Sequence, residues 1–389
     1  MEKRLKIKGE KMKQALVVGC GLSGAVIARE LAEKGFHVDI LEKRNHIGGN
    51  MYDYVDEYGV LVHKYGPHTF HTCKKELYDY MCKYGEWDEY HLTCGAEING
   101  ICTPTPFNFK TIDDFYSEDD AKALKAEIHK LYPGQDTATV VETLNAENKM
   151  VSDYAQFLFD NDYSLYSAKQ WGVSPSEIDP SILKRVPLRF NYNEGYFDDE
   201  FQVMPHVSFT AFFEKLLNHP NINVELGIDA LDRLKIVGEN LEYNGEMVKY
   251  PVVYTGALDE LFSCCFEKLP YRSLRFEWKH EDKDSFQEYP VVAYPQAPDY
   301  VRIIEYKKLP VQNVLGTTYE VEYSLPYKKG QDNEPYYPLL TEESQKIYKN
   351  YLHKAEEIEN LFVCGRLGDF KYYNMDQALE RALEISRKI

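Results

Sequence analysis

A glycine-rich turn between a short apolar strand and a helix constrains this chain more than any other feature. Residues 15–18 form an apolar run, and Gly19, Gly21 and Gly24 then follow in the pattern G-x-G-x-x-G. Apolar side chains recur at helical spacing over residues 25–31. The glycines permit a tight turn and let the backbone approach a pyrophosphate, whose charge the start of the helix attracts. This context predicts a Rossmann-like site for FAD or NAD, against the alternative of a glycine turn that binds no ligand.

An acidic residue stands where a dinucleotide site needs a partner for a ribose. Residues 38–41 read as a second strand, and Glu42 follows it, 18 residues after Gly24. Its carboxylate can accept hydrogen bonds from a ribose diol and would repel a 2′-phosphate. We interpret Gly48 and Gly49 as a second close approach of the backbone, to the phosphates or to a flavin. A simple hairpin turn is the alternative.

Composition excludes several classes of partner. The 389 residues carry 45 Lys and Arg against 63 Asp and Glu, so the net charge is −18. This balance argues against nucleic acid and against anionic membranes, and no apolar run is long enough to span a bilayer. The eight cysteines form no C-x-x-C pair, so we expect reduced thiols and a cytoplasmic location. Three histidines lie close together at 63, 68 and 71, but without acidic residues at ligand spacing we expect no metal there.

Patterns further along the chain divide it into segments. Helical spacing predicts a mostly helical insertion, with helices over 73–84, 111–131, 139–148 and 151–163. Residues 164–205 are rich in Tyr, Pro and Gly, and an irregular segment of this length is usually functional. Strand-like runs from 274 to 321 predict an antiparallel sheet. Residues 361–389 read as a strand, a glycine turn and a helix that return to the nucleotide site.

Eight motifs, taken in order, resemble those of the bacterial UDP-galactopyranose mutase family over residues 14–389. They are GCGLSG with HIGGN, YGPHTFHT, YSAKQW, RVPLRFNYNEGYF, YRSLRFE, DYVRIIEYK, EPYYP and GRLGDFKYYNMDQ. The resemblance implies an α/β fold with a Rossmann-like FAD-binding domain, a helical insertion and an antiparallel-sheet domain. The expected boundaries are 12–75, 206–265 and 350–389 for the FAD domain, 76–170 for the helical domain with a mobile loop following it, and 171–205 with 266–349 for the substrate domain.

The resemblance also implies an activity. Members of the family interconvert UDP-galactopyranose and UDP-galactofuranose without net redox. N5 of reduced FAD attacks the anomeric carbon and expels UDP, the sugar ring opens through an iminium, and it recloses through the other hydroxyl before UDP returns. UDP-galactose is then the substrate, NADPH or NADH the expected reductant, and a homodimer the expected assembly.

Roles follow by position in the motifs. The expected FAD contacts are Gly19, Gly21, Ser23, Gly24, Glu42, Lys43, Gly49, Asn50, His68, Gly365, Arg366 and Met375. The expected substrate contacts are Tyr166, Trp171, Arg185, Tyr196, Arg272, Arg302, Tyr336, Arg366, Tyr372 and Asn374. The resemblance places Arg185, Arg366 and His71 nearest the chemistry, as catalytic residues. The arginines suit a leaving diphosphate because guanidinium groups bind phosphate through paired hydrogen bonds.

Some positions depart from the family pattern. Asn374 stands where many members have Asp, and Ala293 where many have Asn. Asp162 and Tyr163, just before Tyr166, differ from the aromatic run that is usual in the family at this place. These departures leave the sugar preference and the contacts to uracil open. Two rival functions stay open as well: a flavin oxidoreductase of the amine-oxidase kind, and a protein that binds FAD or a UDP-sugar without turnover.

Overall fold

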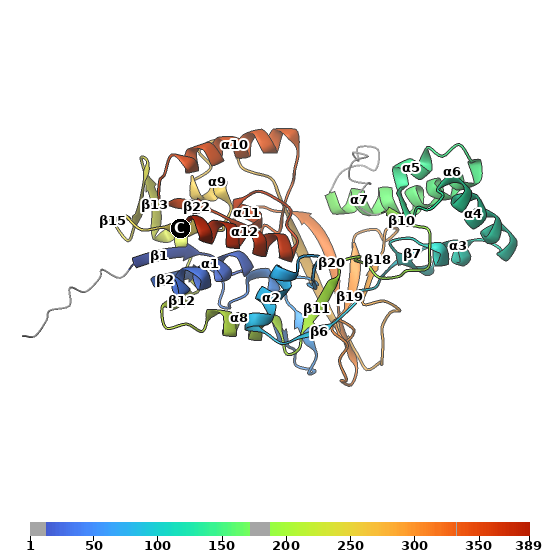
Figure 1. Cartoon of the computed structure of the whole chain (residues 1–389), viewed down its shortest axis with the longest axis horizontal. Coiled ribbons are helices and arrows are strands. Elements are labelled where there is room, and N and C mark those ends of the chain that lie inside the picture. The colour runs from blue at the N-terminus through green and yellow to red at the C-terminus, as the bar shows by residue number, and fades with distance from the viewer. Residues whose placement is uncertain (1–12, 172–186, 332) are drawn as a thin grey trace, which may run out of the picture.

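The structure is a computed structural model that describes residues 13–171, 187–331 and 333–389 (Figure 1). A five-stranded parallel sheet, in the order β12-β2-β1-β16-β22, forms one end of the molecule. Its strands are β1 (Lys13–Val18), β2 (Phe36–Glu42), β12 (Ile222–Leu226), β16 (Val252–Tyr254) and β22 (Leu361–Val363). Segments from the beginning, middle and end of the chain therefore lie side by side, which confirms the predicted Rossmann-like α/β class.

Helices cover both faces of the parallel sheet because successive side chains of β1 point to opposite sides. Ala15 and Val17 pack in one core with α1, α2, α8 and α12, whereas Leu16 and Val18 pack in another with α9 and α10. These helices, with the short α11, are α1 (Leu22–Glu33), α2 (Lys75–Tyr84), α8 (Phe209–Leu217), α9 (Leu258–Leu261), α10 (Glu342–Glu356), α11 (Gly365–Gly368) and α12 (Met375–Lys388). Among the described residues, no helix is long and apolar enough to cross a membrane.

A seven-stranded sheet, in the order β21-β17-β20-β19-β18-β7-β8, occupies the middle of the molecule (Figure 1). Its strands are β7 (Cys94–Ile98), β8 (Ile101–Thr105), β17 (Tyr271–Glu281), β18 (Val291–Ala293), β19 (Arg302–Glu305), β20 (Thr317–Pro326) and β21 (Tyr337–Pro338). All neighbours are antiparallel except β18 and β7. The hairpin β7–β8 comes from the segment expected to be mostly helical, and it extends this sheet at one edge.

Small sheets fill the space around these two large ones. One is the hairpin β3–β4, the second has the order β5-β11-β6, and the third has the order β13-β14-β15. Their strands are β3 (Asp53–Val55), β4 (Leu61–His63), β5 (Phe70–Thr72), β6 (Trp87–Glu89), β11 (Phe201–Pro205), β13 (Leu234–Val237), β14 (Asn240–Tyr243) and β15 (Glu246–Met247). Two short 3-10 helices are η1 (Gly49–Met51) and η5 (Ala230–Asp232).

A helical module lies at the far end from the parallel sheet (Figure 1). It contains α3 (Phe109–Phe115), α4 (Glu118–Leu131), α5 (Val140–Leu144), α6 (Lys149–Leu158), the π-helix η2 (Phe159–Tyr163) and α7 (Ser164–Trp171), with the strand pair β9 (Thr137–Thr139) and β10 (Pro187–Arg189). The single helix predicted over 111–131 is wrong: it is two helices. Tyr116 is extended, and Ser117 caps α4 by accepting a hydrogen bond from the backbone N–H of Asp120.

Candidate functional site

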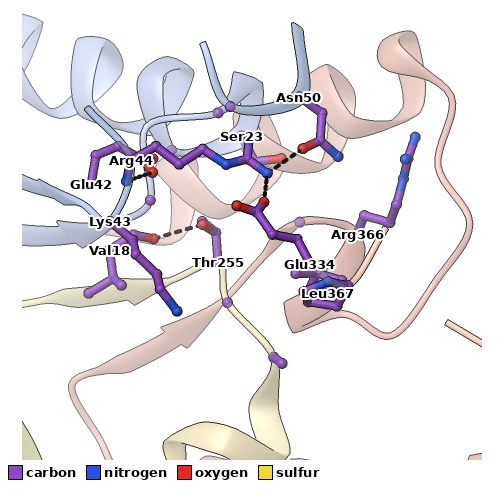
Figure 2. A pocket seen from close by; sticks show the side chains of 18 of the residues that line it. Val18, Ser23, Glu42, Lys43, Arg44, Asn50, Thr255, Glu334, Arg366 and Leu367 are labelled. Atoms are coloured by element: carbon purple, nitrogen blue, oxygen red, sulfur yellow. Dashed lines mark hydrogen bonds and ion pairs between the residues drawn. The ribbon is translucent and has the colours of Figure 1, made fainter. Parts of the chain in front are cut away.

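One cavity lies at the carboxyl ends of β1, β2 and β16, and Figure 2 shows it from close by. Its wall contains residues of the first and last segments of the chain, which approach each other at Ser23 and Gly365. All the residues predicted to contact the cofactor line it: Gly19, Gly21, Ser23, Gly24, Glu42, Lys43, Gly49, Asn50, His68, Gly365, Arg366 and Met375. In an open parallel sheet this edge is where ligands bind.

The backbone at this edge forms a cradle that has no room for a β-carbon at Gly19, Gly24 or Gly49. A β-carbon on Gly24 would lie 2.0 Å from the Gly19 carbonyl oxygen, and one on Gly49 would lie 2.7 Å from the Gly21 α-carbon. Gly19 has a φ of +97° and would bring a β-carbon within 2.1 Å of Thr255 Oγ1. Helix α1 begins at this cradle, and no side chain caps its first turn. Close backbone approach at an uncapped helix start fits a pyrophosphate, so these residues fit an FAD-type dinucleotide.

Glu42 is fixed at the end of β2 by two backbone hydrogen bonds. Its Oε2 accepts the N–H of Cys20 at 2.7 Å, and its Oε1 accepts the N–H of Arg44 at 2.9 Å. A carboxylate offers about four acceptor positions, so the buried group retains capacity for a ribose diol. Burial, and then the charge of Glu42, raises the pKa of the Cys20 thiol to about 12, which keeps this cysteine neutral inside the cradle.

Arg44 also lines the cavity, although the motifs did not single it out. Its Nη2 donates to Asn50 Oδ1 at 2.9 Å and to Glu334 Oε2 (Figure 2). Its guanidinium lies over the ring of Tyr65 at 4.0 Å. The only feature of the sequence that pointed to a cofactor role for Arg44 was its position directly after Glu42 and Lys43. The partner Glu334 is 290 residues away and could not be identified from local spacing.

The three histidines do not act as one group. His68 lines the cavity, donates from its Nδ1 to the Gly66 carbonyl oxygen at 2.9 Å, and donates its backbone N–H to His63 Nδ1 at 3.1 Å. Burial is the main cause that lowers the pKa of His68 to about 4 and that of His63 to about 3, so both are neutral at pH 7. His71 is not in the cavity wall; its Nδ1 lies 2.8 Å from Asp199 Oδ2 and its ring stacks on Phe197. The described chain holds no group of residues suited to a metal ion.

A cluster of arginines and tyrosines adjoins this cavity. Arg366 lies over the rings of Tyr337 and Tyr372, at 4.9 and 5.5 Å, and those rings stack on each other at 5.3 Å. Burial raises the pKa of Tyr166 and Tyr196, and the charge of nearby Arg302 opposes the rise in both. The cluster therefore combines two guanidinium groups with several phenols, which is the chemistry of a phosphate site.

Glu322 holds Arg302 in position. Its Oε2 accepts from Nε at 2.9 Å and from Nη2 at 2.7 Å of Arg302, its cross-strand partner on β19. The same oxygen would lie 3.7 Å from a β-carbon on Gly66, so the loop that carries His68 packs against this ion pair. The ion pair thus joins the arginine cluster to the wall of the dinucleotide cavity.

Of the two tyrosines in EPYYP, Tyr337 rather than Tyr336 lies in the arginine cluster. Tyr336 is buried in the wall of the dinucleotide cavity, with its ring near Tyr65, whereas Tyr337 faces Arg366. The two rings are 6.4 Å apart, yet Tyr336 lies on the side of Tyr65 and Arg44, and Tyr337 lies on the side of Arg366 and Tyr372. Tyr337 was missed because the motif alone does not fix which side faces the cluster.

Arg272 lies between the end of α7 and the seven-stranded sheet. It is 5% exposed and donates from Nη2 to the Lys169 carbonyl at 3.3 Å and to Ser324 Oγ. It therefore ties the end of α7 to the seven-stranded sheet. Asn374 lines the cavity and begins α12, its backbone N–H donating to Gln377 Oε1 at 3.0 Å. Arg185 lies outside the described residues, and only the backbone of Trp171 is described.

Lys169 attaches this helical segment to the seven-stranded sheet at a second point, and Asp162 lies buried near it. Lys169 Nζ donates to the carbonyls of Ala297 at 3.0 Å, Tyr300 at 2.9 Å and Tyr294. Burial lowers the pKa of Lys169 to about 8 and raises that of Asp162 to about 7, with Lys169 opposing the rise at Asp162. Asp162 is thus buried next to the segment that carries Tyr166.

Comparisons with known proteins match both the segment that carries the glycine cradle and the segment that carries the arginine cluster. A family model described as UDP-galactopyranose mutase matches residues 162–372, and one described as an NAD(P)-binding Rossmann-like domain matches residues 17–84. A UDP-galactopyranose mutase from Mycoplasma pneumoniae is 34% identical over 375 residues, covering 95% of this chain and 94% of that protein. A dTDP-fucopyranose mutase from Escherichia coli is also 34% identical, over 380 residues, covering 97% and 98%.

A solved structure of the same kind shares the fold. The crystal structure of reduced UDP-galactopyranose mutase superposes with a TM-score of 0.67 at 16% identity, covering 96% of this chain and 94% of that one.

Proposed function

Because this chain belongs to the UDP-galactopyranose mutase family, we propose that it interconverts UDP-galactopyranose and UDP-galactofuranose with a reduced flavin. The observation that carries the proposal is Arg366. It lines the dinucleotide cavity and also lies over Tyr337 and Tyr372 in the arginine cluster. A nucleotide sugar whose diphosphate sits on the cluster would therefore have its sugar next to the flavin.

A reduced flavin held by the glycine cradle would supply the nucleophile that displaces UDP from the anomeric carbon of the sugar. The chain supplies charge at the leaving diphosphate. Arg302 and Arg366 would bind the departing anion, and one such donor placed at developing charge is worth about 3 kcal/mol. Glu322 fixes the direction of the Arg302 guanidinium before the substrate arrives.

The remaining side chains orient the substrate and exclude water. His63 and His68 are neutral at pH 7 and add no charge beside the sugar. Tyr166, Tyr196 and Tyr372 offer phenolic donors around the nucleotide, and Trp171 and Arg185 belong to the same proposal through their motifs. The proposal also includes FAD held by the glycine cradle, NADPH or NADH as the electron source, and a cytoplasmic homodimer.

A second candidate substrate is a dTDP-6-deoxy sugar. The dTDP-fucopyranose mutase is as similar to this chain as the UDP-galactopyranose mutase from Mycoplasma pneumoniae. The departures at Asp162 and Ala293 fall in or beside the proposed substrate region, so they bear on this choice. The reaction type is the same for both substrates.

The test is chromatography of UDP-galactofuranose incubated with the purified protein, with and without dithionite. We expect conversion to UDP-galactopyranose only under reduction. A parallel assay that starts from UDP-galactopyranose or from dTDP-fucopyranose under reduction decides between the two substrates by the faster formation of the furanose. Net oxidation of substrate would favour the oxidoreductase instead, and no conversion of either nucleotide sugar under reduction would overturn the proposal.

A further inference from the structure

An ion pair joins two distant parts of the chain in the cavity wall. Arg44 follows β2 of the parallel sheet, and Glu334 precedes β21 of the seven-stranded sheet. Their side chains point toward one another and meet beside Asn50 (Figure 2). Both residues line the cavity, so the contact bridges the two sheets at the site itself.

The guanidinium of Arg44 has two contacts besides its ion pair with Glu334. Asn50 accepts from it at 2.9 Å, and the ring of Tyr65 supports its face at 4.0 Å. The Arg44 side chain is only 17% exposed, whereas that of Glu334 is 45% exposed. Arg44 is therefore the more buried and more fully bonded half of the pair, and Glu334 is the more exposed half.

The pair lies between the two ends of the expected dinucleotide. In Figure 2, Glu42 and Lys43 lie on one side of it and Arg366 on the other. A dinucleotide that extends from the ribose site at Glu42 to the flavin site at Arg366 must run alongside the pair. An isolated Glu334 carboxylate would repel this anionic ligand, and the positive charge of Arg44 compensates it.

We propose that the Arg44–Glu334 pair is a clamp between the two sheets that holds the bound flavin dinucleotide and slows its release. The proposal rests on the FAD site of the proposed function. It makes Arg44 and Glu334 positioning residues for the cofactor rather than participants in the reaction. Removing the Glu334 carboxylate should loosen the cavity wall without changing the glycine cradle, whereas removing Arg44 also removes its hydrogen bond to Asn50 beside Gly49.

The experiment measures the rate at which FAD dissociates, from the rise of flavin fluorescence after dilution of the flavin-loaded protein. We expect Arg44→Met and Glu334→Gln each to release FAD at least about tenfold faster than the unchanged chain. The exchanged pair, Arg44→Glu with Glu334→Arg, should recover part of this loss. Glu380→Gln serves as the control, since it breaks an exposed ion pair with Lys74 that also joins distant segments but lies outside the cavity.

Two results would overturn the clamp. One is release from both single variants at the unchanged rate while their circular dichroism melting curves match the parent. The other is slower release from Glu334→Gln, which would show that the carboxylate only repels the cofactor. A parent protein that takes up no FAD would overturn the proposed function and the clamp together, whereas FAD binding with unaltered release overturns the clamp alone.

Discussion

Gly21 and Gly24 lie three residues apart in one turn, yet a methyl group would meet different surroundings at the two positions. A β-carbon on Gly24 would lie 2.0 Å from the Gly19 carbonyl oxygen, whereas one on Gly21 would lie at an ordinary 3.7 Å from the Gly49 α-carbon. The fold therefore requires glycine at position 24. At position 21 the fold admits a methyl group, and glycine is required only by a ligand in the cradle.

We accordingly expect Gly24→Ala to lower the free energy of unfolding by about 1–3 kcal/mol, because backbone must shift to admit the methyl group. Gly21→Ala should leave stability nearly unchanged but weaken FAD binding, since its methyl group would project where backbone and pyrophosphate meet. Urea denaturation of the flavin-free proteins, with flavin titration, separates the two effects. Equal FAD affinity of Gly21→Ala and the parent would contradict the cradle.

Asp162 gives a second residue-level prediction, because burial raises its pKa from 3.8 to about 7. Between these values the folded protein retains a proton that the unfolded chain releases, so the stability contribution of Asp162 is complete below about pH 4 and is lost as the pH rises through 7. Asp162→Asn removes this dependence. The difference in free energy of unfolding between the variant and the parent should shift in favour of the variant by up to roughly 4 kcal/mol from pH 4 to pH 8. A difference that does not change with pH would contradict this account.

Single residues could be predicted from the sequence where local geometry decides their place. The glycines and Glu42 follow from one strand–turn–helix, and they line one cavity. Tyr337 could not be predicted, because the side of β21 that faces Arg366 depends on how that strand joins the sheet. The motif of Arg272 suggested a substrate contact but not its hydrogen bond to the Lys169 carbonyl at the end of α7, because that partner lies 103 residues away.

At the scale of elements, α7 depends on polar contacts with the sheet beside it. Lys169 donates to three carbonyls of the segment between β18 and β19, and Arg272 donates to the carbonyl of Lys169 near the end of the helix. The apolar pattern over 151–163 predicted a helix, and α6 with the following π-helix occupies that range. No pattern predicted the contacts of Lys169, because its acceptors are backbone carbonyls more than a hundred residues away.

We predict that Lys169→Met detaches α7 locally. The loss of a charged donor to three carbonyls should cost about 2 kcal/mol, and hydrogen exchange over residues 164–171 should become faster. FAD should stay bound, while KM for the nucleotide sugar should rise because Tyr166 lies on this helix. Lys149→Met, which breaks an exposed pair with Asp153 on α6, is the matched control. Unchanged exchange in Lys169→Met would show that apolar packing alone holds the helix.

At the scale of the whole molecule, the site depends on segments brought together from distant parts of the chain. The carboxyl edge of the parallel sheet provides the cradle, the C-terminal segment provides Arg366, and the seven-stranded sheet provides Arg302. The overall class could be predicted because each segment carries its own pattern. The edge hairpin β7–β8 and the Arg44–Glu334 contact could not, since both depend on how the modules pack.

A net charge of −18 does not conflict with an anionic substrate in this arrangement. Arg302 and Arg366 act at short range, and water with physiological salt screens exposed charges beyond about 8 Å. The partly buried Arg302 guanidinium is screened less than the surface carboxylates are. The proposed function therefore requires that these arginines meet a diphosphate that leaves and returns during each turnover.

The most direct test of this claim uses UDP-galactopyranose with a heavy oxygen between the anomeric carbon and the β-phosphate. If the anomeric C–O bond breaks and UDP stays bound, the phosphate rotates and the label moves to a non-bridging position, which phosphorus NMR detects. We predict redistribution of the label with the dithionite-reduced protein, at least as fast as formation of UDP-galactofuranose, and none with the oxidised protein. Conversion of the sugar while the label stays in the bridging position would contradict the account.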